Sequence, residues 1–235
     1  MGYEKNYGET SAARVAQVTM SKVYGWMTLA LVASAIAAYY TASSDTMRSL
    51  VFGHKLAFFG LMMAEVALVV YLSARITRLS FGAAAALFGG YSVLTGVTMA
   101  GVLLIYSSGT VHAAFLATAL TFGVMSFVGY TTEKDPTSIG SYLMMALVGL
   151  IIGTLVNVFF HLTWLQSLIT YAGLIIFVGL TAYDTQRVKN TLHYANAAGY
   201  EVETRKIALM GALNLYLDFV NMFLYILRLL CGRQN

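Results

Sequence analysis

Seven apolar segments, each long enough to cross a lipid bilayer, limit this chain to very few folds. One helical crossing takes about 20 consecutive apolar residues. Backbone groups in lipid must be hydrogen-bonded internally, so such segments form helices, whereas a membrane barrel shows alternating stretches of roughly ten residues. The sequence therefore predicts an all-α membrane protein with seven transmembrane helices, at about 20–41, 51–73, 81–106, 110–130, 139–160, 163–184 and 207–230.

Composition supports the membrane class and excludes several others. Of the 235 residues, 59% are hydrophobic and 10% are charged, whereas a soluble domain carries about 25% charged residues. The single cysteine, Cys231, rules out a disulfide or a cysteine metal cluster within one chain. The net charge of +4 would suit nucleic acid, but the basic residues lie where membrane topology places them. We therefore expect a lipid bilayer as the partner and no nucleic acid.

The apolar segments leave little room for other domains. Residues 1–19 are polar and are predicted to form a cytoplasmic tail, and residues 20–231 to form a single seven-helix transmembrane domain. The connections are short except for 42–50 and 185–206, which are predicted to be loops.

Lys and Arg counts predict the orientation of the chain. Cytoplasmic loops of membrane proteins carry the excess of these residues. With the N-terminus in the cytoplasm, that side receives ten of them and the other side four. This predicts a cytoplasmic N-terminus and an outside C-terminus. The short chain and the absence of an organelle signal favour a bacterial inner membrane.

Two pairs of small residues predict close helix packing. Gly149 and Gly153 form a G-x-x-x-G pair, and Ala86 and Gly90 a looser pair of the same spacing. Small residues four positions apart permit two helix backbones to approach in a membrane. Such pairs are common and indicate no activity.

The last apolar segment carries a polar stripe. Asn214, Asp218, Asn221, Tyr225 and Arg228 are spaced by four, three, four and three residues, so they share one face of a helix. A carboxylate at the centre of a membrane helix costs about 2.5 kcal/mol or more. The stripe should therefore face protein or water. It could be a structural seam between helices, but an aspartate also invites a charge partner.

Acidic residues within the apolar segments are few: Glu65, Asp184 and Asp218. Ionisable groups in a membrane are functional candidates by default. If Asp184 and Asp218 lie side by side, both cannot ionise easily and they would share one proton. The predicted spans place Asp218 eleven residues past Ile207, about 16 Å along the helix. The two acids then meet only if one of the two helices extends.

Two C-terminal motifs resemble those of a known family. The run TAYDTQRVK ends the sixth segment, and ALNLYLDFVNMFLYILRLL follows about 30 residues later. Together they are similar to the transmembrane Bax inhibitor motif family, and the resemblance covers essentially the whole chain. It implies a fold in which the C-terminal helix is central and the other six surround it. It also implies a pH-sensitive calcium leak channel.

The resemblance implies roles for individual residues. Asp184 and Asp218 correspond to a proton-sensing pair, which would also bind calcium weakly and transiently. Arg75 or Arg78 would act as a latch against this pair. No cofactor is expected, because calcium is the transported species, and oxygen ligands suit it. Further oxygens along the ion path would come from Glu65, Asn214 and Asn221.

Two other functions compete with the leak channel. Paired membrane aspartates could serve an intramembrane aspartyl protease, but Asp218 lies in Leu-Tyr-Leu-Asp-Phe rather than G-x-G-D, and the only proline is Pro136. We therefore predict that the chain is not an enzyme. The alternative is a regulatory protein that binds other membrane proteins and modulates a membrane protease or stress and cell-death signalling.

Overall fold

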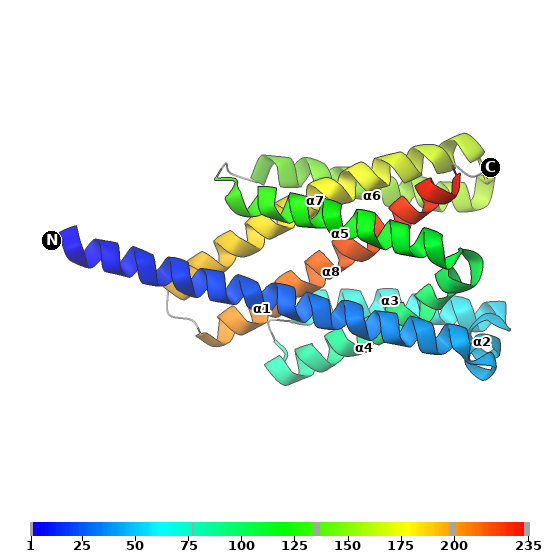
Figure 1. Cartoon of the computed structure of the whole chain (residues 1–235), viewed down its shortest axis with the longest axis horizontal. Helices are drawn as coiled ribbons and strands as arrows, with labels where there is room; N and C mark the ends of the chain where they lie inside the picture. Colours follow the sequence, from blue (N-terminus) through cyan, green and yellow to red (C-terminus); the bar gives the residue numbers. More distant parts are fainter. Residues whose placement is uncertain (1, 77, 134–136, 198–200, 233–235) are drawn as a thin grey trace. The chain divides into compact units, whose positions relative to one another are not determined.

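The computed structural model describes residues 2–76, 78–133, 137–197 and 201–232. These residues form eight helices and no strand, which confirms the all-α prediction (Figure 1). In chain order the helices are α1 (Gly2–Ser43), α2 (Asp45–Phe52), α3 (Lys55–Arg75), α4 (Phe81–Ile105), α5 (Ser108–Thr131), α6 (Thr137–Phe160), α7 (Thr163–Ala197) and α8 (Glu201–Gly232).

Seven of the described helices are long and apolar enough to cross a membrane. They are α1 from Thr19 onward and α3 to α8, which confirms the seven predicted spans. Six of them agree with the predicted bounds to within a few residues, whereas the span in α7 continues to Ala195 rather than ending at Asp184. The most apolar windows of α3 and α6 are only 6% and 11% buried. Because a bilayer solvates apolar side chains, such exposed helix faces are suited to lipid.

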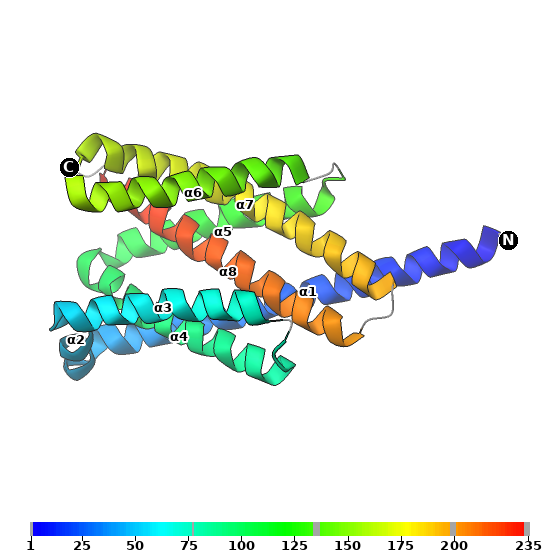
Figure 2. The same cartoon turned by 180° about the vertical axis from the view of Figure 1, so that it is seen from behind.

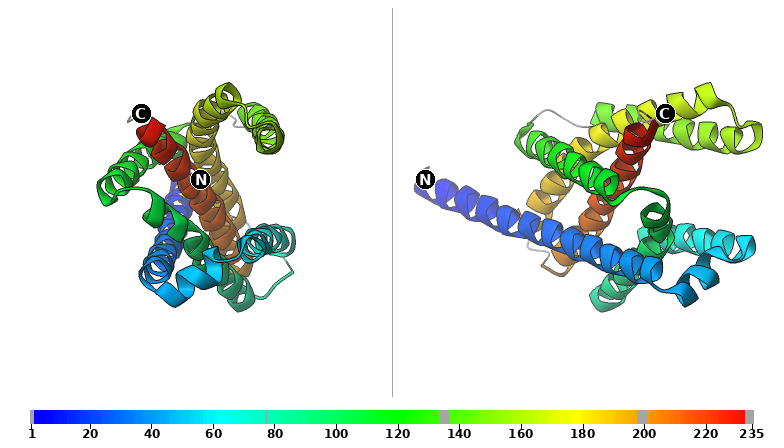
Figure 3. Two further views of the ribbon diagram at one scale, coloured as in Figure 1. Left: turned by 90° about the vertical axis from the view of Figure 1, so that its right-hand side faces the viewer. Right: turned by 45° about the vertical axis from the view of Figure 1, so that its right-hand side comes forward.

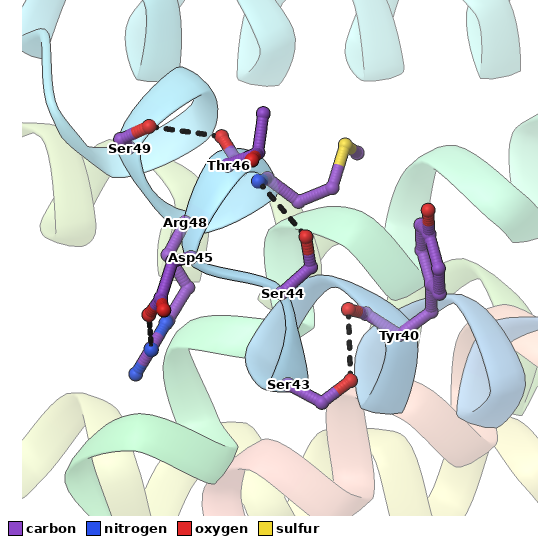
Figure 4. Close-up of polar contacts among 8 residues, drawn as sticks. Tyr40, Ser43, Ser44, Asp45, Thr46, Arg48 and Ser49 are labelled. Carbon is purple, nitrogen blue, oxygen red and sulfur yellow. Dashed lines mark hydrogen bonds and ion pairs between the residues drawn. The ribbon is translucent and has the colours of Figure 1, made fainter.

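The predicted loop 42–50 is wrong, because it contains most of α2. Ser44 begins this short helix: its side chain accepts a hydrogen bond from the Met47 N–H at 3.4 Å. Asp45 in the first turn pairs with Arg48 one turn later (Figure 4). A serine N-cap followed by an acidic residue is a typical helix start, but the segment is too short to show a clear period.

The predicted loop 185–206 is also wrong. Helix α7 continues to Ala197 and α8 begins at Glu201, so both helices extend beyond the apolar run. Residues 2–19 of the predicted polar tail form the first part of α1, which begins at Gly2. The cytoplasmic location of this tail stays a prediction. Apolar length predicts how much of a helix lies in the membrane, but the backbone hydrogen bonds of a helix continue in water.

The chain forms two compact units. The first unit comprises Met1–Ser107 and Val188–Tyr216, and the second comprises Ser108–Arg187 and Leu217–Asn235. Both α7 and α8 contribute to each unit. A single transmembrane domain and a central α8 stay predictions, although the most apolar window of α8 is 67% buried and no other span exceeds 39%.

In the first unit, α1 packs along α4, and α3 lies beside α4 (Figure 2). The close approach of α1 and α4 depends on Gly96, where an added Cβ would clash with the backbone of Ser34. The Ser34 hydroxyl spans the same contact and donates to the carbonyl of Ser92 at 2.7 Å. Helix α2 contacts α1 and α3.

In the second unit, α5 meets both α7 and α8. Gly129 of α5 lies so close to α7 that a Cβ there would clash with the backbone of Ala182. One face of α5 also presents Phe115 and Phe122 to Phe219 of α8, with ring centroids 5.7 and 5.5 Å apart.

Asn157 makes hydrogen bonds across the turn between α6 and α7, two helices that lie side by side (Figure 3). Its Oδ1 accepts the Leu162 N–H at 2.9 Å, and its Nδ2 donates to Oε1 of Gln166 at 2.8 Å. Asn157 is 8% exposed. Because both ends of its amide are bonded, the residue ties the two helices together.

The small-residue pairs do not mark the close contacts. Among the described residues, no atom outside the local backbone lies within 4 Å of a Cβ added at Gly149 or Gly90. A Cβ at Gly153 would touch Ile169 at an ordinary 3.8 Å. Close backbone approach occurs instead at Gly96 and Gly129, neither of which has another glycine four residues before or after it.

Candidate functional site

Two aspartates from consecutive spans meet within the second unit. Asp184 lies in α7 and Asp218 in α8, and their side chains are hydrogen-bonded to each other. Asp218 is 3% exposed, whereas Asp184 is half-buried. Because ionised carboxylates are acceptors only, a hydrogen bond between two carboxyl groups requires a proton on one of them. The arrangement is therefore one in which the two groups can share a proton.

The extended helices explain how the two acids reach the same level. Asp184 lies 13 residues before the end of α7, and Asp218 lies 17 residues after the start of α8. At 1.5 Å per residue these separations are about 20 and 26 Å. Counted from the C-terminal end of α7 and from the start of α8, the two acids therefore lie at similar distances along their helices. The apolar spans alone had placed Asp184 much too shallow.

Arg187 supplies positive charge to the pair. It follows Asp184 by three residues on the same helix, and its guanidinium attracts the Asp184 carboxyl group electrostatically. Residues three apart on a helix are surface neighbours. Arg187 belongs to the TAYDTQRVK motif, but no role was predicted for it from the sequence. The i, i+3 spacing was the signal that could have identified it.

The part of α7 around Asp184 is held against the C-terminal end of α5 and the residue that follows it. Gln186, the residue before Arg187, donates from Nε2 to the carbonyl of Thr132 at 3.0 Å. One turn earlier, Gly129 allows the backbones of α5 and α7 to touch at Ala182. The two contacts follow each other in the same chain direction on both segments, from Gly129 to Thr132 and from Ala182 to Gln186. Together they fix how α7 is aligned along α5 near Asp184.

Three buried polar atoms in the second unit have no hydrogen-bond partner among the described residues. They are Ser126 Oγ, Thr185 Oγ1 and the Oδ2 oxygen of Asp218. Elsewhere in the spans, buried hydroxyls such as those of Thr118 and Thr181 donate to the carbonyl four residues earlier, at 2.7 and 2.8 Å. Ser126 and Thr185 therefore depart from the usual pattern of this chain.

The third intramembrane acid, Glu65, lies in the first unit. Thr95 of α4 donates to its Oε1 at 2.7 Å, and Thr98 to its Oε2 at 3.0 Å. Glu65 is half-buried and Thr95 is 3% exposed. The sequence predicts Glu65 as a candidate but neither threonine, because nothing in the spacing of the threonines identifies the α3 residue that they face.

The two latch candidates also belong to the first unit. Arg75 is the last residue of α3, Arg78 follows it, and both side chains are exposed. Their role as a latch stays a prediction.

The polar stripe of α8 is not buried uniformly. Asp218 is buried, Asn221 and Tyr225 are half-buried, and Arg228 is exposed. Asn221 donates to the carbonyl of Leu217 at 2.8 Å, and Arg228 lies 5.7 Å from the ring centre of Tyr225. Asn214 is half-buried in the first unit. The aspartate is thus the member of the stripe that is enclosed by protein.

The described residues contain no group of three His, Cys, Asp or Glu side chains that could hold a metal ion. Ca²⁺ takes six to eight oxygen ligands. Asp184 and Asp218 can therefore supply only part of a calcium shell, and a passing ion would need neutral oxygens or water as well.

Comparison with known proteins identifies relatives along nearly the whole chain. Residues 16–235 match the family described as inhibitor of apoptosis-promoting Bax1. The inner membrane protein YbhL of Escherichia coli K12 is 42% identical over 224 residues, covering 93% of both chains. An uncharacterized protein of Borreliella burgdorferi is 41% identical, covering 92% of both chains, and an uncharacterized membrane protein of Streptococcus pyogenes is 29% identical, with the same coverage. The chain is therefore a multi-pass membrane protein that belongs to the Bax inhibitor-1 family.

Proposed function

We propose that the protein is a pH-sensitive calcium leak channel gated by the Asp184–Asp218 pair. The observation that carries this proposal is a hydrogen-bonded pair of carboxyl groups inside the apolar spans. A buried ionisable pair is costly in a membrane, so its presence favours a functional role. A proton shared between two helices also makes their contact sensitive to pH.

The gating step follows from the charge of the pair. At higher pH the pair loses protons and becomes more negative, so it attracts a nearby guanidinium more strongly in this poorly screened environment. On protonation that attraction weakens and α8 can change its packing. Arg187 is the basic neighbour in the second unit, and Arg75 or Arg78 is the proposed latch. The leak should therefore increase as the pH falls.

The cation path would use oxygen ligands from several spans. Asp184 and Asp218 provide carboxyl oxygens, and Glu65, Asn214 and Asn221 provide further side-chain oxygens. A leak requires that an ion enter and leave readily, so binding must be weak. The small number of acidic ligands agrees with that requirement. We further propose that the protein resides in a bacterial inner membrane with its N-terminus in the cytoplasm.

Calcium flux in liposomes tests the proposal. Purified protein is reconstituted with a calcium indicator inside, and flux is measured from about pH 6 to about pH 8 with equal pH on both sides, so that mixed orientations do not matter. We expect flux to rise toward acid in the wild-type protein and to lose its pH dependence in Asp184→Asn/Asp218→Asn.

The matched control is Asp45→Asn, which neutralises an exposed acid paired with Arg48. This variant should retain the wild-type pH profile. Unchanged flux and pH dependence in the double variant would refute gating by the aspartate pair.

A further inference from the structure

Glu65 is held by two hydroxyl groups that suit both of its charge states. Thr95 Oγ1 lies 2.7 Å from one carboxyl oxygen, and Thr98 Oγ1 lies 3.0 Å from the other. A hydroxyl can donate to an ionised carboxylate and can equally accept a hydrogen from a protonated one. The carboxyl group can therefore gain or lose a proton without moving its neighbours.

The surroundings of Thr98 make this exchange possible. Its hydroxyl oxygen is 3.0 Å from Glu65 and 2.9 Å from the carbonyl oxygen of Thr95. A hydroxyl has one hydrogen, so it satisfies one of these acceptors at a time. When Glu65 is ionised, Thr98 can donate to the carboxylate. When Glu65 is protonated, Thr98 can turn its hydrogen to the carbonyl.

Ser34 fixes the direction of a second hydrogen bond in the same unit. Its Oγ lies 2.9 Å from the carbonyl of Ala30, 2.7 Å from the carbonyl of Ser92 and 2.7 Å from the hydroxyl of Tyr216. A carbonyl only accepts, so the single hydrogen of Ser34 goes to one of the carbonyls. Tyr216 must then donate its hydrogen to Ser34.

Tyr216 consequently offers only lone pairs to its other neighbour, Thr95, to which it is also hydrogen-bonded. Tyr91 is also hydrogen-bonded to Thr95, but it keeps its own hydroxyl hydrogen and can donate it to Thr95. Thr95 therefore stands between two groups that can only accept its hydrogen, Tyr216 and the ionised carboxylate of Glu65. With Glu65 ionised, the Thr95 hydrogen points to the carboxylate. With Glu65 protonated and donating to Thr95, that hydrogen is free to turn to Tyr216.

We propose that Glu65 is a proton-binding site separate from the aspartate pair, and that Thr95 transmits its protonation state to Tyr216 of α8. The titratable groups that face Glu65 are Tyr91 of α4 and Tyr216 of α8. The charged residues of α2, which also contacts α3, pair with each other. The site needs no calcium flux to operate.

The position of Tyr216 suits it to receive this signal. Its side chain is fully buried, and its ring makes edge contacts with Phe88 and Tyr91 at 5.8 and 5.9 Å. Packed rings restrain the phenol, so a change in its hydrogen bonding is not averaged by motion. Tyr216 also precedes Asp218 by two residues on the same helix.

Infrared difference spectroscopy tests the proposal in the full-length protein in lipid. The background is Asp184→Asn/Asp218→Asn, which leaves Glu65 as the acidic residue of the seven spans among the described residues. Spectra recorded at successively lower pH are compared with the spectrum at about pH 8. We expect a protonated-carboxyl band and an accompanying tyrosine band, and both should disappear in Glu65→Gln.

Substitutions of the relay separate the two bands. Thr95→Val should keep the carboxyl band and lose the tyrosine band, whereas Thr95→Ser, which retains the hydroxyl, should keep both. Tyr216→Phe should lose the tyrosine band, while Tyr91→Phe should keep it. Thr98→Val serves as the matched control, because it removes a partner of Glu65 but should leave the tyrosine band present.

Specific outcomes would overturn the proposal. A carboxyl band that survives Glu65→Gln, or no such band in the background protein, would remove the proton site. A tyrosine band that survives Thr95→Val, or one lost in Tyr91→Phe but not in Tyr216→Phe, would remove the route to α8. If Glu65→Gln fails to fold, comparison of Thr95→Ser with Thr95→Val still decides the question, and a failed calcium assay affects none of these readings.

Discussion

Replacing Asp218 by asparagine should change how the stability of the protein depends on pH. In the wild type, the hydrogen bond between Asp184 and Asp218 requires a proton. Asparagine donates from its own amide, so Asp218→Asn can preserve a hydrogen bond to Asp184 with no shared proton. The substitution therefore removes the proton requirement while nearly preserving the size of the side chain.

The magnitude follows from counting protons. The folded pair holds one proton, whereas two separated aspartates in the unfolded chain hold almost none near neutral pH. Unfolding then releases one proton, and its free energy falls by about 1.4 kcal/mol for each unit of rising pH. The dependence ends where the folded pair itself loses the proton. Asp218→Asn should flatten this part of the profile.

Thermal unfolding in detergent micelles, measured from about pH 5 to about pH 7.5, supplies the comparison. The wild type should become less stable toward alkaline pH, and Asp218→Asn should change much less. Asp45→Asn is the control, because Asp45 is exposed and lies outside the seven spans. A profile in Asp218→Asn as steep as the wild-type profile would refute proton sharing by this pair.

Three further substitutions test the packing around the site. Gly129→Val should destabilise the protein by more than about 2 kcal/mol in thermal unfolding, because its Cβ would clash with the backbone of Ala182. The control Gly123→Ala, on an open face, should be nearly neutral, and equal effects of the two substitutions would contradict this packing. Thr185→Val removes a buried hydroxyl without a described partner and should be neutral or stabilising by about 1 kcal/mol; a clear loss of stability would mean that the hydroxyl binds something. Asn157→Leu should lower the free energy of unfolding by about 1–3 kcal/mol, because the Leu162 N–H and the Gln166 side chain lose their hydrogen-bond partner. An unchanged melting temperature would show that these two hydrogen bonds do not stabilise the contact between α6 and α7.

Much of the architecture follows from local properties of the chain. Seven apolar runs predict seven spans because lipid requires each crossing to satisfy its own backbone hydrogen bonds. The same argument selects Glu65, Asp184 and Asp218 as the unusual residues, since a carboxyl group in a span is costly wherever it occurs. These conclusions need no knowledge of which helices are neighbours.

The helix ends around the site could not be obtained in this way. The segment 185–206 is polar and resembles a loop, yet α7 and α8 extend through most of it. Polar residues form helices as readily as apolar ones where water solvates them, so hydropathy does not mark the end of a helix that leaves the membrane. The extension of α7 and α8 beyond their apolar runs is what allows Asp184 and Asp218 to meet.

Partners across helices required the folded structure. Periodicity indicates the face on which Glu65 lies, but not that Thr95 and Thr98 of another helix would bind it. Gly129 likewise has no more distinctive sequence context than Gly149, yet one lies against a neighbouring backbone and the other is open among the described residues. Lipid is a good solvent for apolar faces, so many arrangements of the same helices bury similar side chains. The choice among them rests on contacts between residues distant in sequence, which no local pattern contains.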